Sequence, residues 1–350
     1  TSTLAEADPI LIRYAPDGTV DWVRSVESAS GSALTAAGAE FQAVTFNAQG
    51  DIVVLVTQTD EVNIEYQADP PVSIFAASSV QRTLLRYEAD GSLAGASGDG
   101  GTGGAGALPT TSAATLTGSG EAWAVGTVSS FNPGPPPSDS LQGWIQQVDL
   151  DFGGSDATSS DVVFGGSAAG GGDTIYVAGE FTGGGSVEID SDTGVSVSGS
   201  QAGTQYPLVL AYDVASGPDA EWSYTAASVE AGGDTVFIDL AVDQYGNIFA
   251  VGYQTGTGTV DWGAGVSSSG AFAGRNAVVL RLNPSGQPVS VWTPSASSDE
   301  TVLTAATVST AGLPVVAGFQ EGTAPLTWPG DRSSTGTFNG PDAVLLRLLP

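Results

Sequence analysis

The sequence predicts an all-β fold built from repeated four-stranded units, and three observations support this prediction. Short apolar runs, rich in β-branched and aromatic residues, alternate with Gly-containing turns along all 350 residues. Two kinds of hairpin alternate, with a period of 61 to 73 residues. The chain opens with one complete hairpin of the second kind and ends within another. Units of this length with four strands are typical of propeller blades, so we expect a five-bladed β-propeller of antiparallel blades.

The first kind of hairpin would supply the two inner strands of each blade. Each copy is a strand, a tight turn and a second strand, and the copies are residues 40–59, 111–130, 161–183, 237–256 and 302–322. Four copies carry a glycine late in the second strand, and the first copy has Thr57 instead; the glycines are Gly126, Gly179, Gly252 and Gly318.

The second kind of hairpin would supply the two outer strands. Its copies are residues 10–25, 83–97, 144–154, 208–225, 277–293 and the shortened 343–350, and they align on Arg13, Arg86, Gln147, Ala211, Arg281 and Arg347. Trp22, Trp222 and Trp292 hold similar places in the last strand, where we expect them to fill the gap between blades. A looser tract at 61–81, 186–204, 259–277 and 325–343, shortened to 131–140 in the second blade, predicts an arm between the second and third strands.

These motifs resemble the SBBP-type repeats of bacterial extracellular β-propellers. Residues 242–252 (VDQYGNIFAVG), followed by 275–292 (RNAVVLRLNPSGQPVSVW), are similar to that repeat, and residues 258–265 (GTVDWGAG) look like a tract between its strands. The second blade lacks the Gly-Asn pair, and Arg, Gln or Ala replaces the usual Lys. The resemblance implies a secreted or surface propeller and no catalytic motif.

We expect a single domain over residues 1–350. Its blades would lie at about 40–98, 108–154, 161–228, 234–297 and 300–350, the last completed by 8–28. Residues 18–25 would close the ring by hydrogen-bonding to 343–349, which leaves one strand surplus, because 9–15 and 342–349 compete for one place. The surplus strand can extend a blade, belong to a longer protein, or pair with a second molecule. We favour self-association, carried by Ile10, Leu11, Ile12, Trp22, Val344, Leu345 and Leu346.

Composition narrows the function classes. The chain has no Cys, His, Met or Lys, which excludes disulfides, thiolate or imidazole metal sites, histidine triads and lysine Schiff bases. Its net charge of −30 would repel nucleic acid and anionic membranes, and no apolar run is long enough to span a membrane. The missing Met predicts a processed or excised chain. Together with the Gly-, Ser- and Thr-rich composition, it favours an extracellular or cell-surface location after removal of an N-terminal segment.

Few residues remain for catalysis. Paired carboxylates could hydrolyse glycosidic bonds, and Asp239 and Asp243 are the acids in or beside a predicted innermost strand. Both lie in one blade, and Asp243 begins a turn of the repeat. We therefore expect no enzyme and no required cofactor.

Two ligand-binding hypotheses stay open, one for calcium and one for a glycan. Calcium could bind Glu188, Asp190 and Asp192, or Asp149, Asp151 and Asp156, against the alternative that these acids serve turns and solvation. Trp262 and Trp328 could stack on a glycan, or fill space between blades. The favoured function is a non-enzymatic extracellular structural subunit that assembles with itself into filaments. A carbohydrate-binding propeller is the alternative, and a glycosidase is third.

Overall fold

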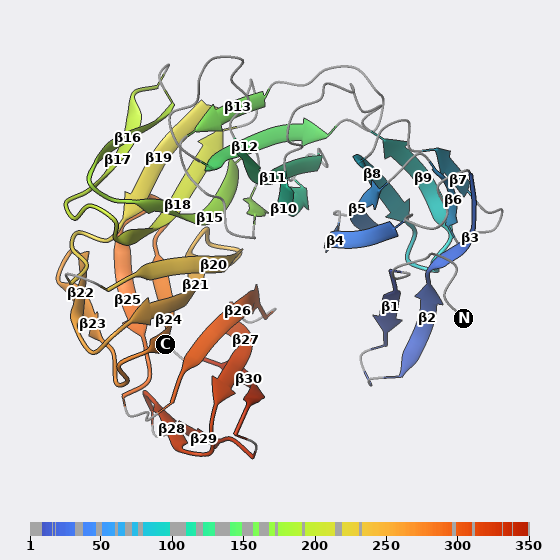
Figure 1. Cartoon of the computed structure of the whole chain (residues 1–350). Helices are drawn as coiled ribbons and strands as arrows, with labels where there is room; N and C mark the ends of the chain where they lie inside the picture. Colours follow the sequence, from blue (N-terminus) through green and yellow to red (C-terminus); the bar gives the residue numbers. More distant parts are fainter. Residues whose placement is uncertain are drawn as a thin grey trace. The chain divides into compact units, whose positions relative to one another are not determined.

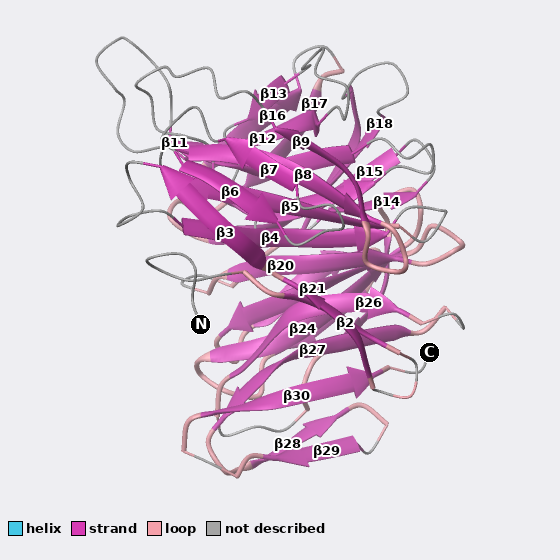
Figure 2. Ribbon diagram, turned by 90° about the vertical axis from the view of Figure 1, so that its right-hand side faces the viewer, coloured by secondary structure: helices cyan, strands magenta, loops and turns pink. Residues whose placement is uncertain are grey.

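The structure is a computed structural model, and the residues that it describes form strands and no helix (Figure 2). It describes residues 9–348 except 16, 18, 32–37, 47–50, 60–61, 67–71, 76–79, 99–109, 117–121, 130–140, 149–156, 161–167, 172–173, 191–192, 214–218, 231–232, 296–298, 310–311, 331 and 338. The prediction of an all-β fold made of small antiparallel sheets is confirmed. Within these residues no helix is long and apolar enough to cross a membrane.

Contacts divide the chain into two compact units. Unit 1 comprises residues 1–124 and 146–156, and unit 2 comprises residues 125–145 and 157–350. The single domain over 1–350 therefore stays a prediction.

Unit 1 contains a four-stranded sheet, called sheet I, and the hairpin that precedes it (Figure 1). Sheet I has the order β4 (Gly38–Phe46), β5 (Ile52–Thr59), β8 (Val80–Tyr87) and β9 (Leu93–Gly98). The hairpin of β1 (Leu11–Tyr14) and β2 (Val20–Arg24) is called the terminal hairpin. The arm of sheet I pairs β6 (Val62–Tyr66) with β7 (Val72–Phe75), and β3 (Val26–Gly31) joins β6.

The next sheet in the chain, sheet II, is described by its backbone alone. It has the order β10 (Thr110–Leu116), β11 (Ala122–Ser129), β12 (Leu141–Val148) and β13 (Ala157–Ser160). The predicted alternation of an inner and an outer hairpin therefore applies to this segment too. Its arm, expected at 131–140, lies outside the described residues.

Unit 2 repeats the same plan. Sheet III has the order β14 (Ala168–Gly171), β15 (Thr174–Thr182), β18 (Gln205–Asp213) and β19 (Asp219–Thr225). Sheet IV has the order β20 (Thr235–Val242), β21 (Ile248–Thr255), β24 (Arg275–Leu282) and β25 (Pro288–Trp292). Sheet V has three strands, β26 (Thr301–Val308), β27 (Pro314–Glu321) and β30 (Pro341–Arg347).

The predicted arms are present as hairpins between the second and third strands. They are β16 (Gly185–Asp190) with β17 (Val195–Gly199), β22 (Thr259–Gly263) with β23 (Val266–Ser269), and β28 (Pro325–Trp328) with β29 (Arg332–Thr335). Figure 1 shows β22 and β23 beside sheet IV, and β28 and β29 beside sheet V.

A β-bulge in the first strand recurs in sheets I, IV and V and corrects one predicted position. The bulge is followed by the same register, in which Gly252 lies opposite Phe237 and Gly318 opposite Leu303. The residue at this place in sheet I is Val56, opposite Phe41. The prediction that Thr57 replaces the glycine was therefore wrong by one residue. At Gly252 and Gly318 a Cβ would lie 2.0 Å from a carbonyl oxygen of the first strand, which explains the glycine there.

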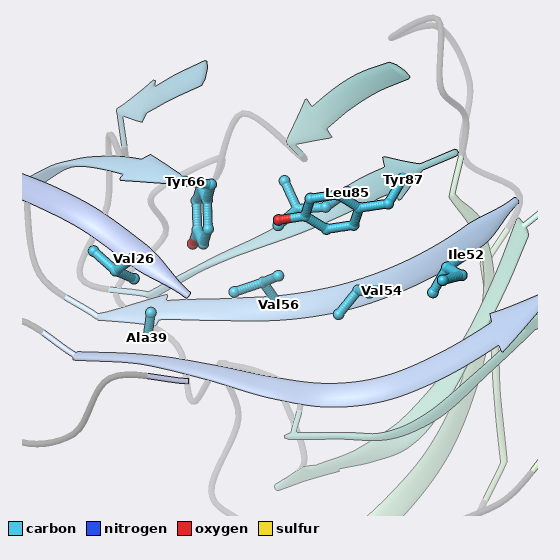
Figure 3. Packing of buried hydrophobic residues seen from close by; sticks show 8 residues of the cluster. All are labelled: Val26, Ala39, Ile52, Val54, Val56, Tyr66, Leu85 and Tyr87. Atoms are coloured by element: carbon cyan, nitrogen blue, oxygen red, sulfur yellow. The ribbon is translucent and has the colours of Figure 1, made fainter. Parts of the chain in front are cut away.

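The core consists of apolar layers on the sheet faces. In sheet IV the middle strands β21 and β24 are buried on both faces. In unit 1, Figure 3 shows the corresponding cluster, in which Tyr87 points its hydroxyl toward Tyr66. Both hydroxyls are buried and have no hydrogen-bond partner among the described residues. Burial raises the pKa of Tyr87 to about 12 and raises that of Tyr66 further.

The predicted ring closure is not among the described strand pairs. β2 pairs with β1, and β30 pairs with β27. A pairing of 18–25 with 343–349 does not occur in the described part of the chain, and closure of the ring stays a proposal.

Candidate functional site

The same backbone link, from a serine to the arm of the sheet that follows it, occurs at three places in the described residues. In unit 2, Ser228 follows sheet III and exchanges two backbone hydrogen bonds with Asp261 in the arm of sheet IV, at 3.0 and 3.2 Å. Ser295 follows sheet IV and donates its N–H to Thr327 in the arm of sheet V at 2.8 Å. In unit 1, Ser28 lies opposite Glu65 in the arm of sheet I. In the described residues the arm thus ties sheet IV to sheet III, sheet V to sheet IV, and sheet I to the segment that follows the terminal hairpin.

A tryptophan and a glycine make a second contact at these junctions. Trp222 of sheet III covers Gly286 in the last turn of sheet IV, where a Cβ would lie 2.7 Å from the ring. Trp22 covers Gly91 in sheet I in the same way, at 3.0 Å, and its Nε1 donates to the Ala89 carbonyl. The terminal hairpin therefore contacts sheet I in the same way as the last two strands of sheet III contact sheet IV.

Trp292 does not belong to this set, contrary to the sequence prediction. Trp22 lies opposite Arg13, and Trp222 lies opposite Ala211, which aligns with Arg13. The residue opposite Arg281 is Ser290, two residues before Trp292. Trp292 instead lies against the buried cluster that residues of sheets IV and V form together. Compared with Trp22 and Trp222, Trp292 is two residues further along its strand. Its side chain therefore points to the same face of the sheet but does not make the same contact.

The terminal hairpin has one buried face and one exposed face. Leu11 and Trp22 lie against the buried cluster of unit 1. The opposite face is apolar and exposed, with cross-strand pairs of Ile12 with Val23 and of Tyr14 with Val20. Its side chains are Ile10, Ile12, Tyr14, Val20 and Val23, with exposed fractions of 41–61%. An exposed apolar face of this kind marks an interaction surface.

Among the described residues sheet V has three strands, and β27 is the strand that pairs with β30. No strand of the described part of the chain lies on the other side of β30, where sheets I, III and IV have a fourth strand. Arg332 of the arm donates its Nη1 to the Arg347 carbonyl of β30. Val344 and Leu346 lie on the face of β30 that is directed at the core, and Leu348 follows them into the buried cluster. On the other face Leu345 is 74% exposed.

β1 and β30 are equivalent strands that bury opposite faces. Arg13 and Arg347 align, since each takes the place of Arg281 in sheet IV. Leu11 therefore corresponds to Leu345, and Ile12 to Leu346. Leu11 is packed where Leu345 is exposed, and Ile12 is exposed where Leu346 is partly buried. Each strand exposes the face that the other buries.

Trp262 and Trp328, the predicted glycan platform, are core residues with 1% exposure. Trp262 stacks on Phe237 and donates its Nε1 to Ser268 Oγ at 2.8 Å, and Ser268 donates to Gln254 Oε1. This burial favours packing between sheets, the alternative to ligand stacking. Neither ring offers a face to a sugar.

The glutamine in this network recurs and was missed by the sequence analysis. The side chains of Gln58, Gln254 and Gln320 are all buried at the same strand position. Ser334 donates to Gln320 as Ser268 does to Gln254, which ties each arm to its sheet. The sequence contains a signal for this network, because a Gln follows the repeated glycine by two residues. The polarity of the Gln side chain suggested instead that it is exposed.

The carboxylates of Asp239 and Asp243 are occupied by backbone groups. Asp239 accepts from the N–H groups of Ala306, at 2.6 Å, and Leu240, at 2.7 Å. Asp243 accepts from Tyr245 and Asn247 inside its own turn. The first joins two neighbouring sheets and the second shapes a turn, as the turn alternative predicted.

Of the predicted calcium ligands, two are described. Glu188 is exposed, and Asp190 accepts from the N–H groups of Thr193, at 3.4 Å, and Ala220, at 2.9 Å. Asp190 therefore caps its own hairpin and joins it to β19. Asp192, Asp149, Asp151 and Asp156 lie outside the described residues. Within the described ranges no three acidic side chains gather as a metal site would require.

Two junctions of unit 2 differ in charge. Between sheets IV and V, Arg275 pairs with Glu300 at 2.6 Å and lies between the rings of Tyr253 and Phe319. Between sheets III and IV, Gln205 takes the place of Arg275. Gln205 donates its Nε2 to Glu180 at 2.8 Å and its N–H to Asp234 at 2.9 Å. Burial, and then the negative charge of Asp234, raise the pKa of Glu180.

A polar pocket of 620 Å³, open to solvent, lies beside the link of Ser228 with Asp261. Glu230 is the charged residue in its wall, and its carboxylate lies where a Cβ on Gly258 would be. The lining residues are Gln201, Ser228, Val229, Glu230, Thr257, Gly258 and Thr259. The pocket offers hydroxyl, amide and carboxylate groups and no aromatic platform.

No protein-family model matches this chain, and no curated protein matches it either. The resemblance to SBBP-type repeats therefore stays a prediction, and the functional argument depends on the geometry above.

Proposed function

We propose that this protein is a five-bladed β-propeller that serves as a non-enzymatic structural subunit of the cell exterior and assembles with itself. The repeated plan of sheets I to V supports the blades. The blade that would close the ring is the one represented twice, by the terminal hairpin and by sheet V. We also propose that the protein is exported and that its blades are SBBP-type repeats.

The junction contacts support the propeller. The link of a serine to the arm recurs at Ser28, Ser228 and Ser295, and the cover of a tryptophan over a glycine recurs at Trp22 and Trp222. Recurrent contacts between successive units generate a regular array, and propellers are such arrays closed radially. The terminal hairpin takes part in these contacts as the outer half of a blade.

The observation that carries self-association is the complementarity of β1 and β30. Each leaves apolar side chains in water that its equivalent buries. Within the described residues no second strand flanks β30, and such an edge is a template for strand addition. Burial of apolar area contributes about 25 cal/mol per Å², so covering these faces would stabilise an assembly.

Net charge opposes this assembly. With a charge of −30, copies of the chain repel one another. At physiological ionic strength, salt largely screens this repulsion between charges that are more than roughly 8 Å apart. Association is therefore expected to strengthen with salt or divalent cations.

Light scattering and electron microscopy of the purified chain test the proposal. We expect a concentration-dependent increase in mass in salt, with filaments or rings in the images. Leu345→Ser should weaken association, while Tyr245→Ser, which alters an equally exposed residue elsewhere in unit 2, should not. A wild-type chain that stays monomeric at high concentration in salt and Ca²⁺ would overturn the proposal.

In that outcome, a carbohydrate-binding propeller becomes the better candidate. The observation in its favour is the polar pocket beside the Ser228 link. A glycan array separates this function from assembly. A glycosidase has less support, because both candidate carboxylates hold backbone groups.

A further inference from the structure

We infer that β1 is a replaceable strand and that β30 of a second copy takes its place beside β2. The assembled interface is then a four-stranded sheet made of β26, β27 and β30 from one chain and β2 from the next. This inference rests on the proposed self-association and names its surface, register and partner.

The register follows from the repeat. In the terminal hairpin Arg13 lies opposite Trp22, and Ile12 lies opposite Val23. Arg347 and Leu346 are the equivalents of these two β1 residues. The composite sheet therefore places Arg347 opposite Trp22 and Leu346 opposite Val23. The register shift after Arg13 matches those in β8–β9, β18–β19 and β24–β25, so β2 has the geometry of a fourth strand.

Side chains fit the exchanged position. Leu345 would enter the place of Leu11 against the buried cluster of unit 1, and its 74% exposure would be removed. Arg347 would replace Arg13 beside Asp21, an ion pair of 3.5 Å in the hairpin. Val344 and Leu346 would keep their contacts in sheet V. Neither chain would have to repack the face that it already buries.

β1 is the strand that leaves, because it is held less firmly. Its ladder with β2 joins four residue pairs, whereas β30 joins β27 through seven. Its ion pair of Arg13 with Asp21 is exposed, and such pairs contribute little. Ile10, Ile12 and Tyr14 face solvent in the hairpin, so β1 buries few of its side chains there.

A disulfide that locks the hairpin tests this exchange. The chain has no cysteine, so Ile12→Cys with Val23→Cys introduces a single pair. Residues directly opposite in antiparallel strands lie about 4.5–5.5 Å apart, a separation that a disulfide spans. We expect the oxidised variant to stay monomeric by light scattering and the reduced variant to assemble. Assembly of the oxidised variant equal to that of the reduced one would overturn the exchange while leaving self-association intact.

Crosslinking between two single variants tests the register. Chains carrying Val23→Cys are mixed with chains carrying Leu346→Cys under mild oxidation, and a covalent dimer is expected. Leu345→Cys is the matched control, because it would face Arg24 and the other side of the sheet. We expect several-fold more mixed dimer with Leu346→Cys.

The double variant, Val23→Cys with Leu346→Cys, identifies the partner. Crosslinks between chains support the second copy. A crosslink formed only within one chain would show that the strand closes its own ring, and would overturn the inference. If the wild type does not associate, the proposed function fails as well, and light scattering without any cysteine detects this separately.

Discussion

Trp222 lies across Gly286, so that a Cβ on this glycine would lie 2.7 Å from the indole. The glycine has a φ of +73°, which other L-residues adopt at a cost. Both the ring and the turn therefore exclude a side chain at this position. The contact joins sheet III to sheet IV and has an equivalent at Trp22 and Gly91.

Gly286→Ala should destabilise unit 2 by more than the positive φ alone requires. The left-handed conformation costs about 1–2 kcal/mol for a residue with a Cβ, and displacement of Trp222 adds to it. Gly265→Ala is the matched control, since it has a φ of +79° and no atom within 4 Å of the Cβ position. Urea denaturation of both variants measures the difference. Equal losses would show that the tryptophan yields without cost.

Thr301 and Thr235 form a second matched pair. The Oγ1 of Thr301 accepts from the N–H of Ala277 at 2.9 Å. Thr235 is equally buried, but its Oγ1 has no hydrogen-bond partner in the described part of the chain, because the residue in the place of Ala277 is Pro207, which has no N–H. Thr301→Val should cost about 1–3 kcal/mol by leaving a buried N–H unpaired, and Thr235→Val should be neutral or stabilising. Equal effects in urea denaturation would contradict this account.

The strand plan of this protein could be predicted from its sequence more readily than its contacts. Alternation and turn residues mark the strands and arms locally, so these were predicted correctly. The position of Val56 was misjudged by one residue, although an alignment of Ile52 with Ile248 already places Val56 at Gly252. Gln254 was missed because its burial depends on Ser268 and Trp262, which only the folded arm brings near. Trp262 was a candidate glycan platform because the sequence alone does not show that the folded arm buries its ring.

Asp190 should stabilise its arm with or without calcium. Its carboxylate accepts backbone N–H groups of Thr193 and Ala220, so Asp190→Ala removes a cap and leaves an amide of β19 without this partner. We expect a loss of about 1 kcal/mol in EDTA. If Asp190 and Asp192 also bind Ca²⁺, added Ca²⁺ should raise the melting temperature of the wild type and not of the variant. If millimolar Ca²⁺ leaves the melting temperature of the wild type unchanged, the two residues do not bind calcium and serve only the structure of the arm.

The junction of sheets III and IV should grow weaker as pH rises, because Glu180 is largely buried there beside the like charge of Asp234. Its pKa is raised above the ordinary 4.5 by burial first and by Asp234 second. The folded chain then binds more protons than the unfolded chain between 4.5 and the raised pKa, so the free energy of unfolding falls as pH increases through this interval.

Glu180→Gln removes that charge while keeping an oxygen for Gln205 Nε2, whose hydrogen bond to Glu180 is 2.8 Å long. The other charged and titratable neighbours of the site, Asp234 and Tyr253, remain in place. The variant should therefore be more stable than the wild type at neutral pH, and the difference should vanish as the pH approaches 4.5. Glu188→Gln, at an exposed position of β16, serves as the control and should change little. Urea denaturation at a series of pH values measures the difference, and a constant gap between Glu180→Gln and wild type would show that the carboxylate stays ionised throughout.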